Sequence, residues 1–207
     1  MTGVDLAENK INLARALYAD IPGGEEVTLV CDDIYRMTPP AEKYDVVFMR
    51  DVIEHIHDQE RFMVFIRRFM HEGSRFFLAF PPWQNPFGGH QQICRHRWLA
   101  RLPWVHLLPA SLYRLLLRAA GESPATVESL EEIRETRLTI ERFEALYTRS
   151  GFCLAARALF LVNPNYEVKF GLRPRPQPAL IAALPWIRNF LTTSVYYCLL
   201  PGKEPGL

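Results

Sequence analysis

The sequence predicts an α/β protein built on a doubly wound, mostly parallel sheet. Over residues 1–80, short apolar runs alternate with segments of helical periodicity in the order strand, helix, strand, strand, helix, strand. Polar side chains directly follow three of the apolar runs, at Asp5, Asp33 and Arg50. Open sheets of this class bind ligands beyond the carboxyl ends of their strands, so these positions are the first candidates for a site.

The first half of the chain gives the alternating elements. The expected strands and helices are 1–5, 7–20, 27–30, 44–49, 58–70 and 75–80. The run over 44–49 is almost wholly apolar, which is typical of a strand buried on both faces. Pro81 and Pro82 end the strand over 75–80, because proline cannot continue a central ladder.

The second half predicts a lobe, a helix and two further strands. Residues 84–129 are rich in Trp, Leu, Arg and Pro and predict a helical insertion. A helix is expected to begin after Thr139, a suitable N-cap residue, and to end at Ser150. Strands are expected over 152–162 and 192–200, joined by a connector over 163–191.

Composition excludes several classes of protein. The 24 basic and 23 acidic residues nearly cancel, so no global charge favours nucleic acid and no nucleic-acid partner is expected. The four cysteines are scattered without a CxxC pair, which indicates reduced thiols rather than a disulfide or metal framework. No uninterrupted apolar run reaches the roughly 18 residues of a spanning helix. A cytoplasmic protein is therefore expected.

Charge is nevertheless unevenly distributed. No Asp or Glu occurs over residues 73–121. The arginines in this stretch are Arg75, Arg95, Arg97, Arg101, Arg114 and Arg118. A solvated face is the simplest interpretation, and a site for an anionic substrate or lipid headgroup is the alternative. The apolar residues of the same lobe would suit packing in a core, an apolar or amphipathic acceptor, or peripheral membrane contact through residues 95–118.

Each strand end offers a role toward a nucleoside-type ligand. Asp5 could accept both ribose hydroxyls or cap the following helix. Asp33 could accept from an adenine amino group while Ile34 covers the ring, although a turn also favours Asp there. The backbone at Arg50 could line the amino acid part of such a cofactor.

Two histidines are candidates for proton transfer. His90 lies in the loop after the strand over 75–80, and His55 lies in the loop after the strand over 44–49. A histidine near its neutral pKa could take a proton from an acidic OH, NH or CH group of a substrate. His55 and His57 could also suggest a metal, but a structural or solvent-facing pair is the preferred interpretation, and no metal site is predicted.

Together, these residues resemble a known family. The ordered motifs are GVDL at 3–6, CDDI at 31–34, YDVVFMRDVIEHIHD at 44–58, FLAFPPW at 77–83 and LTIERFEALYTRSGF at 138–152. This set resembles the class I S-adenosylmethionine-dependent methyltransferases, and most closely those that act on small molecules. The resemblance implies a Rossmann-like sheet with an antiparallel hairpin of the strands over 152–162 and 192–200 at one edge. It also implies S-adenosyl-L-methionine as cofactor and methyl transfer to a small-molecule or amphipathic acceptor.

The resemblance also implies roles for single residues. Asp5 would bind the ribose hydroxyls and Leu6 would lie against the adenine. Asp33 would lie near the adenine amino group, with Ile34 on the ring. The residues beside the methionine part of the cofactor would be Met49 and Arg50. His90 is the first candidate for the substrate pocket, and His55 is the second.

One part of the family pattern has no counterpart. The first strand and its glycine-rich E-x-G-x-G-x-G loop do not occur in the sequence. We therefore expect residues 1–207 to be a single N-terminally truncated methyltransferase-like domain, preceded by an upstream segment of roughly 30 to 50 residues. The helical lobe over 84–129, which follows the family's fifth strand, would cover the substrate. The alternative is a non-catalytic fragment or partner subunit without cofactor binding. A nicotinamide-dependent oxidoreductase is a weaker alternative, since no Tyr-x-x-x-Lys pair is recognisable.

Overall fold

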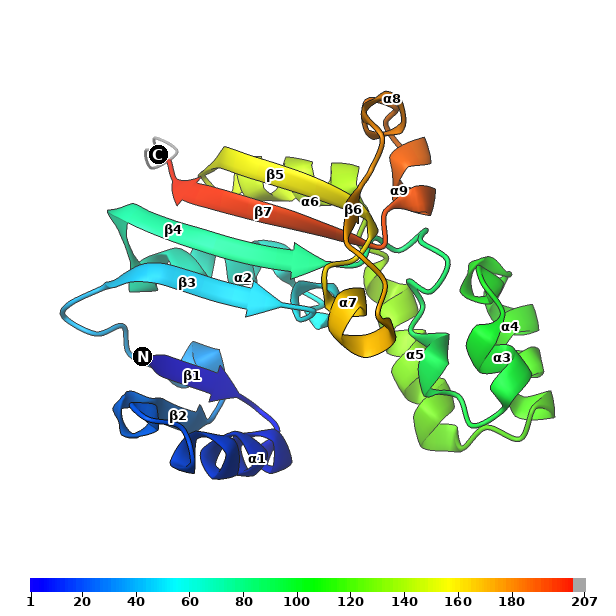
Figure 1. Ribbon diagram of the computed structural model, residues 1–207, viewed down its shortest axis with the longest axis horizontal. Coiled ribbons are helices and arrows are strands. Elements are labelled where there is room, and N and C mark those ends of the chain that lie inside the picture. Colours follow the sequence, from blue (N-terminus) through cyan, green and yellow to red (C-terminus); the bar gives the residue numbers. More distant parts are fainter. Residues whose placement is uncertain (203–207) are drawn as a thin grey trace. The chain divides into compact units, whose positions relative to one another are not determined.

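The computed structural model describes residues 1–202 (Figure 1). The chain forms two compact units, residues 1–43 and residues 44–207. We call them the N-terminal unit and the C-terminal unit.

The N-terminal unit is a small parallel βαβ unit. Strands β1 (Thr2–Asp5) and β2 (Thr28–Cys31) pair in parallel, and helix α1 (Glu8–Ala19) connects them and contacts both. The register places Asp5 opposite Cys31, so both strands end at the same edge. Among the described residues this sheet has only these two strands.

The C-terminal unit contains a five-stranded mixed sheet in the order β3-β4-β7-β5-β6. The strands are β3 (Tyr44–Arg50), β4 (Met70–Phe80), β5 (Phe152–Val162), β6 (Arg175–Pro176) and β7 (Ser194–Pro201). β3 and β4 are parallel, whereas β4 with β7, β7 with β5 and β5 with β6 are antiparallel. The antiparallel pair of β5 and β7 matches the predicted edge hairpin. The sheet is mixed rather than mostly parallel, and the doubly wound arrangement of the whole chain remains a prediction.

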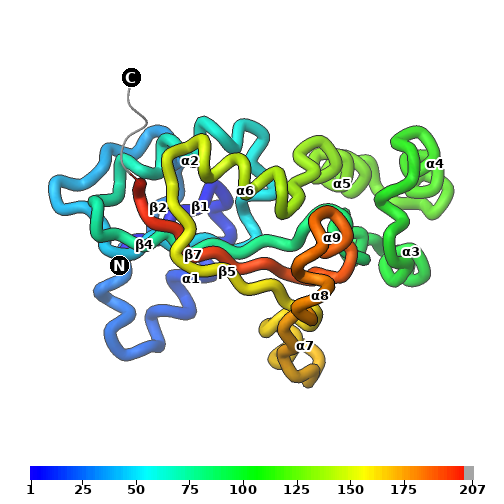
Figure 2. The backbone as a smooth tube through the Cα atoms, turned by 90° about the horizontal axis from the view of Figure 1, so that it is seen from above, coloured from blue at the N-terminus to red at the C-terminus, as the bar shows by residue number. Residues whose placement is uncertain are grey.

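Helices α2 (Gln59–Ile66) and α6 (Ile140–Arg149) contact each other and cover one face of this sheet (Figure 2). The Phe143 ring of α6 lies 4.9 Å from the Tyr197 ring and 5.0 Å from the Phe80 ring, measured between centroids. These three aromatic side chains centre the core of the unit. The predicted cap of α6 is present, because the Thr139 hydroxyl accepts a hydrogen bond from the Arg142 N–H at 3.0 Å.

Two details differ from the sequence prediction. The expected helix over 58–70 ends at Ile66, and β4 begins at Met70 rather than at residue 75. A short 3₁₀ turn over 67–69 carries the chain from helix to strand, so the buried Phe69 and Met70 follow the helical apolar spacing without lying in the helix. Helical periodicity alone therefore misplaced this boundary.

The second difference concerns β3, which was expected to be buried on both faces. Val46 and Phe48 are 62% and 66% exposed. Phe48 stacks on Phe77, which points to the face opposite Phe76 and Phe80 and therefore away from α6. β3 is also the edge strand of its sheet. The apolar run of β3 is thus covered on one face only.

Residues 84–129 hold most of a helical lobe with its own small core. Its helices are α3 (Arg97–Arg101), α4 (Ala110–Ala119) and α5 (Pro124–Thr136), so the last one continues beyond residue 129. The buried core residues of the lobe are Cys94, Leu99, Val105, Tyr113, Leu117, Val127 and Leu130. The lobe lies beyond the carboxyl ends of β3 and β4 (Figure 1).

The connector between β5 and β7 contains short helices. These are α7 (Asn165–Phe170), α8 (Ala179–Ala182) and α9 (Ile187–Leu191), and the two residues of β6 lie between α7 and α8. Over residues 1–202, no helix has the length and apolar character needed to cross a bilayer.

Candidate functional site

A cluster of ionisable side chains lies where β3 and β4 end. The parallel register pairs Arg50 with Ala79, so the loops that follow the two strands leave the same edge of the sheet. The Asp51 N–H donates to the Ala79 carbonyl at 2.9 Å and ties the start of the first loop to β4. The rings of His55 and His90, one from each loop, meet edge to face with their centroids 5.2 Å apart. The structure therefore brings together the two predicted catalytic histidines.

The loop after β3 is held by neighbouring helices. It makes a 3₁₀ turn over Ile53–His55, preceded by Asp51 with a left-handed φ of 53°. The Gln59 side-chain amide donates to the Ile53 carbonyl at 3.0 Å, and the Thr136 hydroxyl donates to the Glu54 carbonyl at 2.5 Å. These contacts from α2 and α5 fix the backbone at Glu54.

The loop after β4 is held by close packing of its glycines. A Cβ atom on Gly89 would lie 2.2 Å from the Cβ of His106, and one on Gly88 would lie 2.3 Å from the Trp83 carbonyl oxygen. His106 is itself buried, with its Nε2 2.7 Å from that carbonyl oxygen. His90 then follows with a left-handed φ of 56°. Only glycines permit this close approach, which places His90 opposite His55.

Glu54 forms the centre of the cluster. Glu54 is 3% exposed, and neither of its carboxylate oxygens has a hydrogen-bond partner among the described residues. Its Oε1 lies 3.9 Å from the His55 Nε2 and 4.0 Å from the His90 Nε2, beyond hydrogen-bond distance. We call these three residues the Glu54 cluster.

Burial shifts the titration of this cluster. It raises the pKa of Glu54 to about 8, with the dipole of the residue's own backbone N–H opposing the rise and the charge of Asp51 adding to it. Burial likewise lowers the pKa of His90 to about 4; the charge of His55 lowers this pKa further, and that of Asp51 opposes the change. At neutral pH, without a bound ligand, the Glu54 carboxyl is mostly protonated and the His90 imidazole is uncharged. Strongly perturbed groups in one loop cluster are typical of functional sites.

The sequence analysis did not include Glu54 among the site residues. The feature of the sequence that could have pointed to Glu54 is an acidic residue beside Ile53 in a loop that follows a strand. His57, which the sequence placed beside His55, lies apart from the cluster. It contacts Glu132 at 3.3 Å and Glu135 at 3.8 Å in an acidic groove of about 830 Å³ along α5. This groove is not lined by the Glu54 cluster, so His55 and His57 do not face one common ligand.

The predicted cofactor-binding residues of the C-terminal unit lie at the same strand end. Met49 is half-buried, and Arg50 is exposed with its Nε 3.2 Å from the Asp51 Oδ2. Tyr166 of α7 is near enough to Asp51 for that charge to raise its pKa, although burial is the larger cause. This end of β3 is therefore surrounded by polar groups.

The predicted cofactor-binding residues of the N-terminal unit also share a sheet edge. The Asp5 carboxylate accepts from the Ala7 N–H at 2.8 Å and lies 3.5 Å from the Lys10 ammonium. The Asp33 carboxylate accepts from the Tyr35 N–H at 3.0 Å. Leu6 is 75% exposed and Ile34 is half-buried. Both carboxylates thus form turns at the ends of β1 and β2, which does not prevent their outer oxygens from accepting further hydrogen bonds.

Comparison with known sequences finds a similarity in the first part of the chain. Residues 1–78 match the sequence model of the methyltransferase domain. The match spans β1, α1 and β2 of the N-terminal unit and, in the C-terminal unit, β3 with its following loop, α2 and most of β4.

Comparison with solved structures shows the same fold at low sequence identity. The plantazolicin methyltransferase BpumL, solved with a desmethyl-plantazolicin analogue and S-adenosylhomocysteine (SAH), has a TM-score of 0.51 and 12% identity over 98% of this chain. A methyltransferase from Thermotoga maritima, described as a possible histamine N-methyltransferase, has a TM-score of 0.53 and 11% identity over 97% of this chain. The CcbJ methyltransferase from Streptomyces caelestis has a TM-score of 0.53 and 14% identity over 97% of this chain. This chain spans 66%, 72% and 74% of their respective lengths.

Proposed function

We propose that this chain, which carries a class I S-adenosylmethionine-dependent methyltransferase domain, transfers a methyl group to a small-molecule or amphipathic acceptor. The observation that supports this proposal most is the position of the Glu54 cluster at the carboxyl ends of β3 and β4. Open α/β sheets bind their ligands at this edge. BpumL, which shares the fold, was solved with SAH, the product of methyl donation.

The residues present fit such a cofactor. S-adenosylmethionine supplies a methyl group on a sulfonium, which is already a strong electrophile. Asp5 would accept from the ribose hydroxyls and Asp33 from the adenine amino group, with Leu6 and Ile34 against the ring. The exposure of Leu6 supports its role, because an apolar side chain at a strand end is then available to a ligand. Met49 and Arg50 would lie beside the methionine part.

The protein's contribution to the chemistry would be position and proton transfer. With the cofactor bound, the protein would hold a nucleophilic atom of the acceptor in line with the methyl group, so that the methyl group would pass to the acceptor and SAH would remain. An acceptor OH or NH group must also lose its proton. When no metal ion is bound to it, the uncharged His90 imidazole would accept that proton as a weak base, because burial lowers its pKa to about 4. The His55 ring lies in edge contact with it. Glu54, whose pKa of about 8 is close to neutral pH, is a second group able to exchange a proton at the same place.

Calorimetric titration of the full chain with SAH tests the cofactor assignment. We expect one saturable site in the wild type. Asp5→Asn and Asp33→Asn should each weaken it by about 10-fold or more, because each removes a charge-assisted hydrogen bond. Asp20→Asn, an exposed change at the end of α1, should bind SAH as the wild type does. A wild type that shows no saturable binding would favour the non-catalytic alternative and reject the proposal.

We also propose that the helical lobe meets the amphipathic part of the acceptor, or a membrane surface that contains it. The observation in favour is a set of exposed apolar side chains next to exposed arginines on α3 and α4. Trp98 is 83% exposed and Leu115 is 64% exposed. The exposed arginines of residues 95–118 are Arg95, Arg97, Arg101, Arg114 and Arg118. A protein surface that carries apolar side chains between cationic ones favours binding to an anionic amphipathic surface.

Vesicle sedimentation tests this second assignment. The wild type should pellet with vesicles that contain anionic lipid and stay in the supernatant with purely zwitterionic ones. Trp98→Ser should reduce the pelleted fraction several-fold, whereas Trp186→Ser, which changes an exposed tryptophan outside the lobe, should not. Equal sedimentation of both variants would exclude the lobe as the contact surface.

A further inference from the structure

The Glu54 cluster has the composition of a metal site. One carboxylate oxygen and two imidazole nitrogens, from Glu54, His55 and His90, all lie within 4.8 Å of one another. The carboxylate comes from the loop after β3, and one imidazole comes from each of the two loops. We propose that this cluster binds a single divalent transition-metal ion, for which Zn²⁺ is the best match.

The first argument for a bound cation is that the Glu54 carboxylate is buried without hydrogen-bond partners. The Glu54 side chain is 4% exposed, yet both of its oxygens lack a hydrogen-bond partner among the described residues. A buried polar group without a partner costs on the order of 1–3 kcal/mol, and an ionised one costs more. A cation would satisfy both oxygens at once. The fixed backbone at Glu54, held by Gln59 and Thr136, keeps the carboxylate in this position.

The geometry is close to that of a bound site. The Glu54 Oε1 lies 3.9 Å from one imidazole Nε2 and 4.0 Å from the other. Ligand atoms on a tetrahedral zinc, with bonds of about 2.0 Å, lie about 3.3 Å apart. The two separations from Glu54 therefore need to shorten by about 0.6–0.7 Å, and the separation between the two imidazole nitrogens, which is at most 4.8 Å, by at most about 1.5 Å. Rotation of the two histidine side chains, which are 39% and 26% exposed, can supply this.

The donor set selects among metals. Imidazole nitrogen favours Zn²⁺, Co²⁺, Ni²⁺ and Cu²⁺ over Mg²⁺ and Ca²⁺, which prefer oxygen ligands. Two imidazoles and one carboxylate give three protein ligands, so a fourth position stays open for water or a substrate oxygen. Asp51 is close enough for its charge to act on both Glu54 and His90, which adds to the attraction for a cation.

Titration of the metal-free full chain with Co²⁺, followed by visible absorption, tests the proposal directly. Co²⁺ substitutes for Zn²⁺ in imidazole–carboxylate sites and can be observed spectroscopically, and Zn²⁺ should then displace it. We expect one equivalent to bind to the wild type. Glu54→Gln and His90→Gln should each weaken binding by about 100-fold or more, since changes even in the outer shell of a site cost about 10–100-fold.

Two histidine variants serve as controls. His71 lies on β4 far from its carboxyl end and pairs with Asp45 at 3.0 Å, so His71→Gln should bind Co²⁺ as the wild type does. His57→Gln reports on the acidic groove along α5 and should also bind normally. Near-ultraviolet circular dichroism of each variant identifies any that fail to fold.

The outcomes separate clearly. Saturable binding that is lost in both cluster variants and kept in both controls supports the site. A wild type without saturable binding overturns it, as does wild-type affinity in folded Glu54→Gln or His90→Gln. Loss of binding in His57→Gln alone would place the metal in the groove and also overturn the proposal. The assay contains no methyl donor, so its result is independent of the proposed methyl transfer.

Discussion

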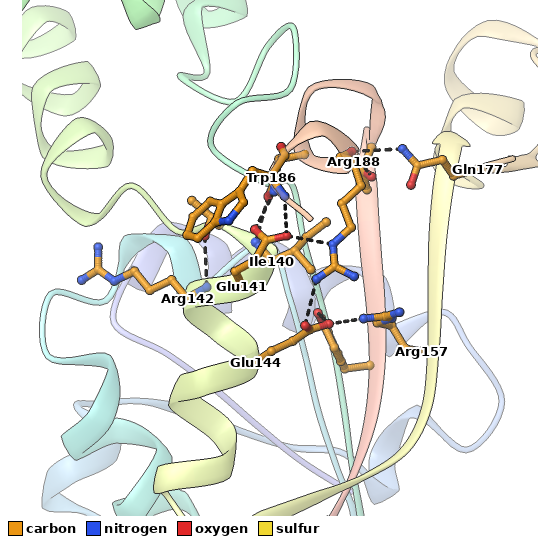
Figure 3. A network of polar contacts seen from close by, with 12 residues as sticks. Ile140, Glu141, Arg142, Glu144, Arg157, Gln177, Trp186 and Arg188 are labelled. Carbon is orange, nitrogen blue, oxygen red and sulfur yellow. Dashed lines mark hydrogen bonds and ion pairs between the residues drawn. The ribbon is translucent and has the colours of Figure 1, made fainter. Parts of the chain in front are cut away.

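Replacing Arg188 by methionine should destabilise the C-terminal unit by about 3–5 kcal/mol. Arg188 of α9 is only 8% exposed and joins two carboxylates of α6 (Figure 3). Its Nε donates to the Glu141 Oε1 at 2.8 Å, and a terminal nitrogen donates to the Glu144 Oε2 at 2.9 Å. Methionine keeps much of the side-chain volume but removes the charge and leaves both carboxylates without this partner.

The magnitude follows from the burial of this network. Glu141 and Glu144 are 15% and 24% exposed, so water would only partly replace the lost cation. Glu144 would keep Arg157 and the Tyr197 hydroxyl as partners, and Glu141 would keep the Asn189 amide. For a protein of this size, a loss of 1 kcal/mol lowers Tm by about 2–4 °C, so the variant should melt about 6–20 °C lower.

Urea unfolding followed by tryptophan fluorescence measures this loss. All four tryptophans lie within residues 83–186, so the signal reports on the C-terminal unit. The control is Arg149→Met on the same helix as Glu141. Arg149 pairs with Glu60 at 3.6 Å on an exposed surface, and its loss should cost about 1 kcal/mol or less. A loss in Arg188→Met no larger than in this control would refute the reasoning.

Lowering the pH should reduce the stability that the contacts among Arg188, Glu141 and Glu144 contribute. Burial favours the neutral form of Glu141, but hydrogen bonds from the Trp186 N–H, Asn189 and Arg188 outweigh it and lower the pKa of this carboxyl below its usual 4.5. A carboxyl with a lowered folded-state pKa contributes stability above its unfolded pKa and loses it as pH falls through the folded value. Wild-type stability should therefore decline below about pH 4.5, and the decline should be shallower in Arg188→Met.

Three further predictions concern the site and the packing. His90→Ala should lower methyl-transfer turnover by about 100-fold or more without abolishing SAH binding, and unchanged turnover would remove His90 from the proton-transfer step. Thr139→Ala should lower the free energy of unfolding by about 1 kcal/mol through loss of the α6 cap; a change below about 0.3 kcal/mol would contradict that role. Leu130→Ala, in the fully buried core of the lobe, should cost about 2–5 kcal/mol in the same urea assay, and a near-neutral result would show that the lobe does not pack as described.

Local patterns in the sequence identified the features that depend on few neighbours. The Thr139 cap, the strand over 152–162 and the polar strand ends at Asp5 and Asp33 all follow from residues within a turn of one another. The antiparallel pairing of β5 with β7 was expected from the family resemblance rather than from any local pattern. These elements needed no knowledge of tertiary packing.

The features that the sequence did not reveal depend on distant contacts. Glu54 is buried because Thr136, 82 positions later, and Gln59 hold its loop against two helices. The early start of β4 depends on the Ser74 hydroxyl, which donates to the Tyr44 carbonyl at 2.7 Å. The exposed face of β3 depends on which side of the sheet α6 covers. None of these contacts leaves a periodic signal in the sequence.

A crystal structure of the full chain with SAH would test the central claim most directly, because that claim assigns the polar strand ends to a nucleoside ligand. We predict that the Asp5 carboxylate accepts from both ribose hydroxyls and that Asp33 lies at the adenine amino group. A ligand bound away from Asp5 and Asp33 would contradict the account.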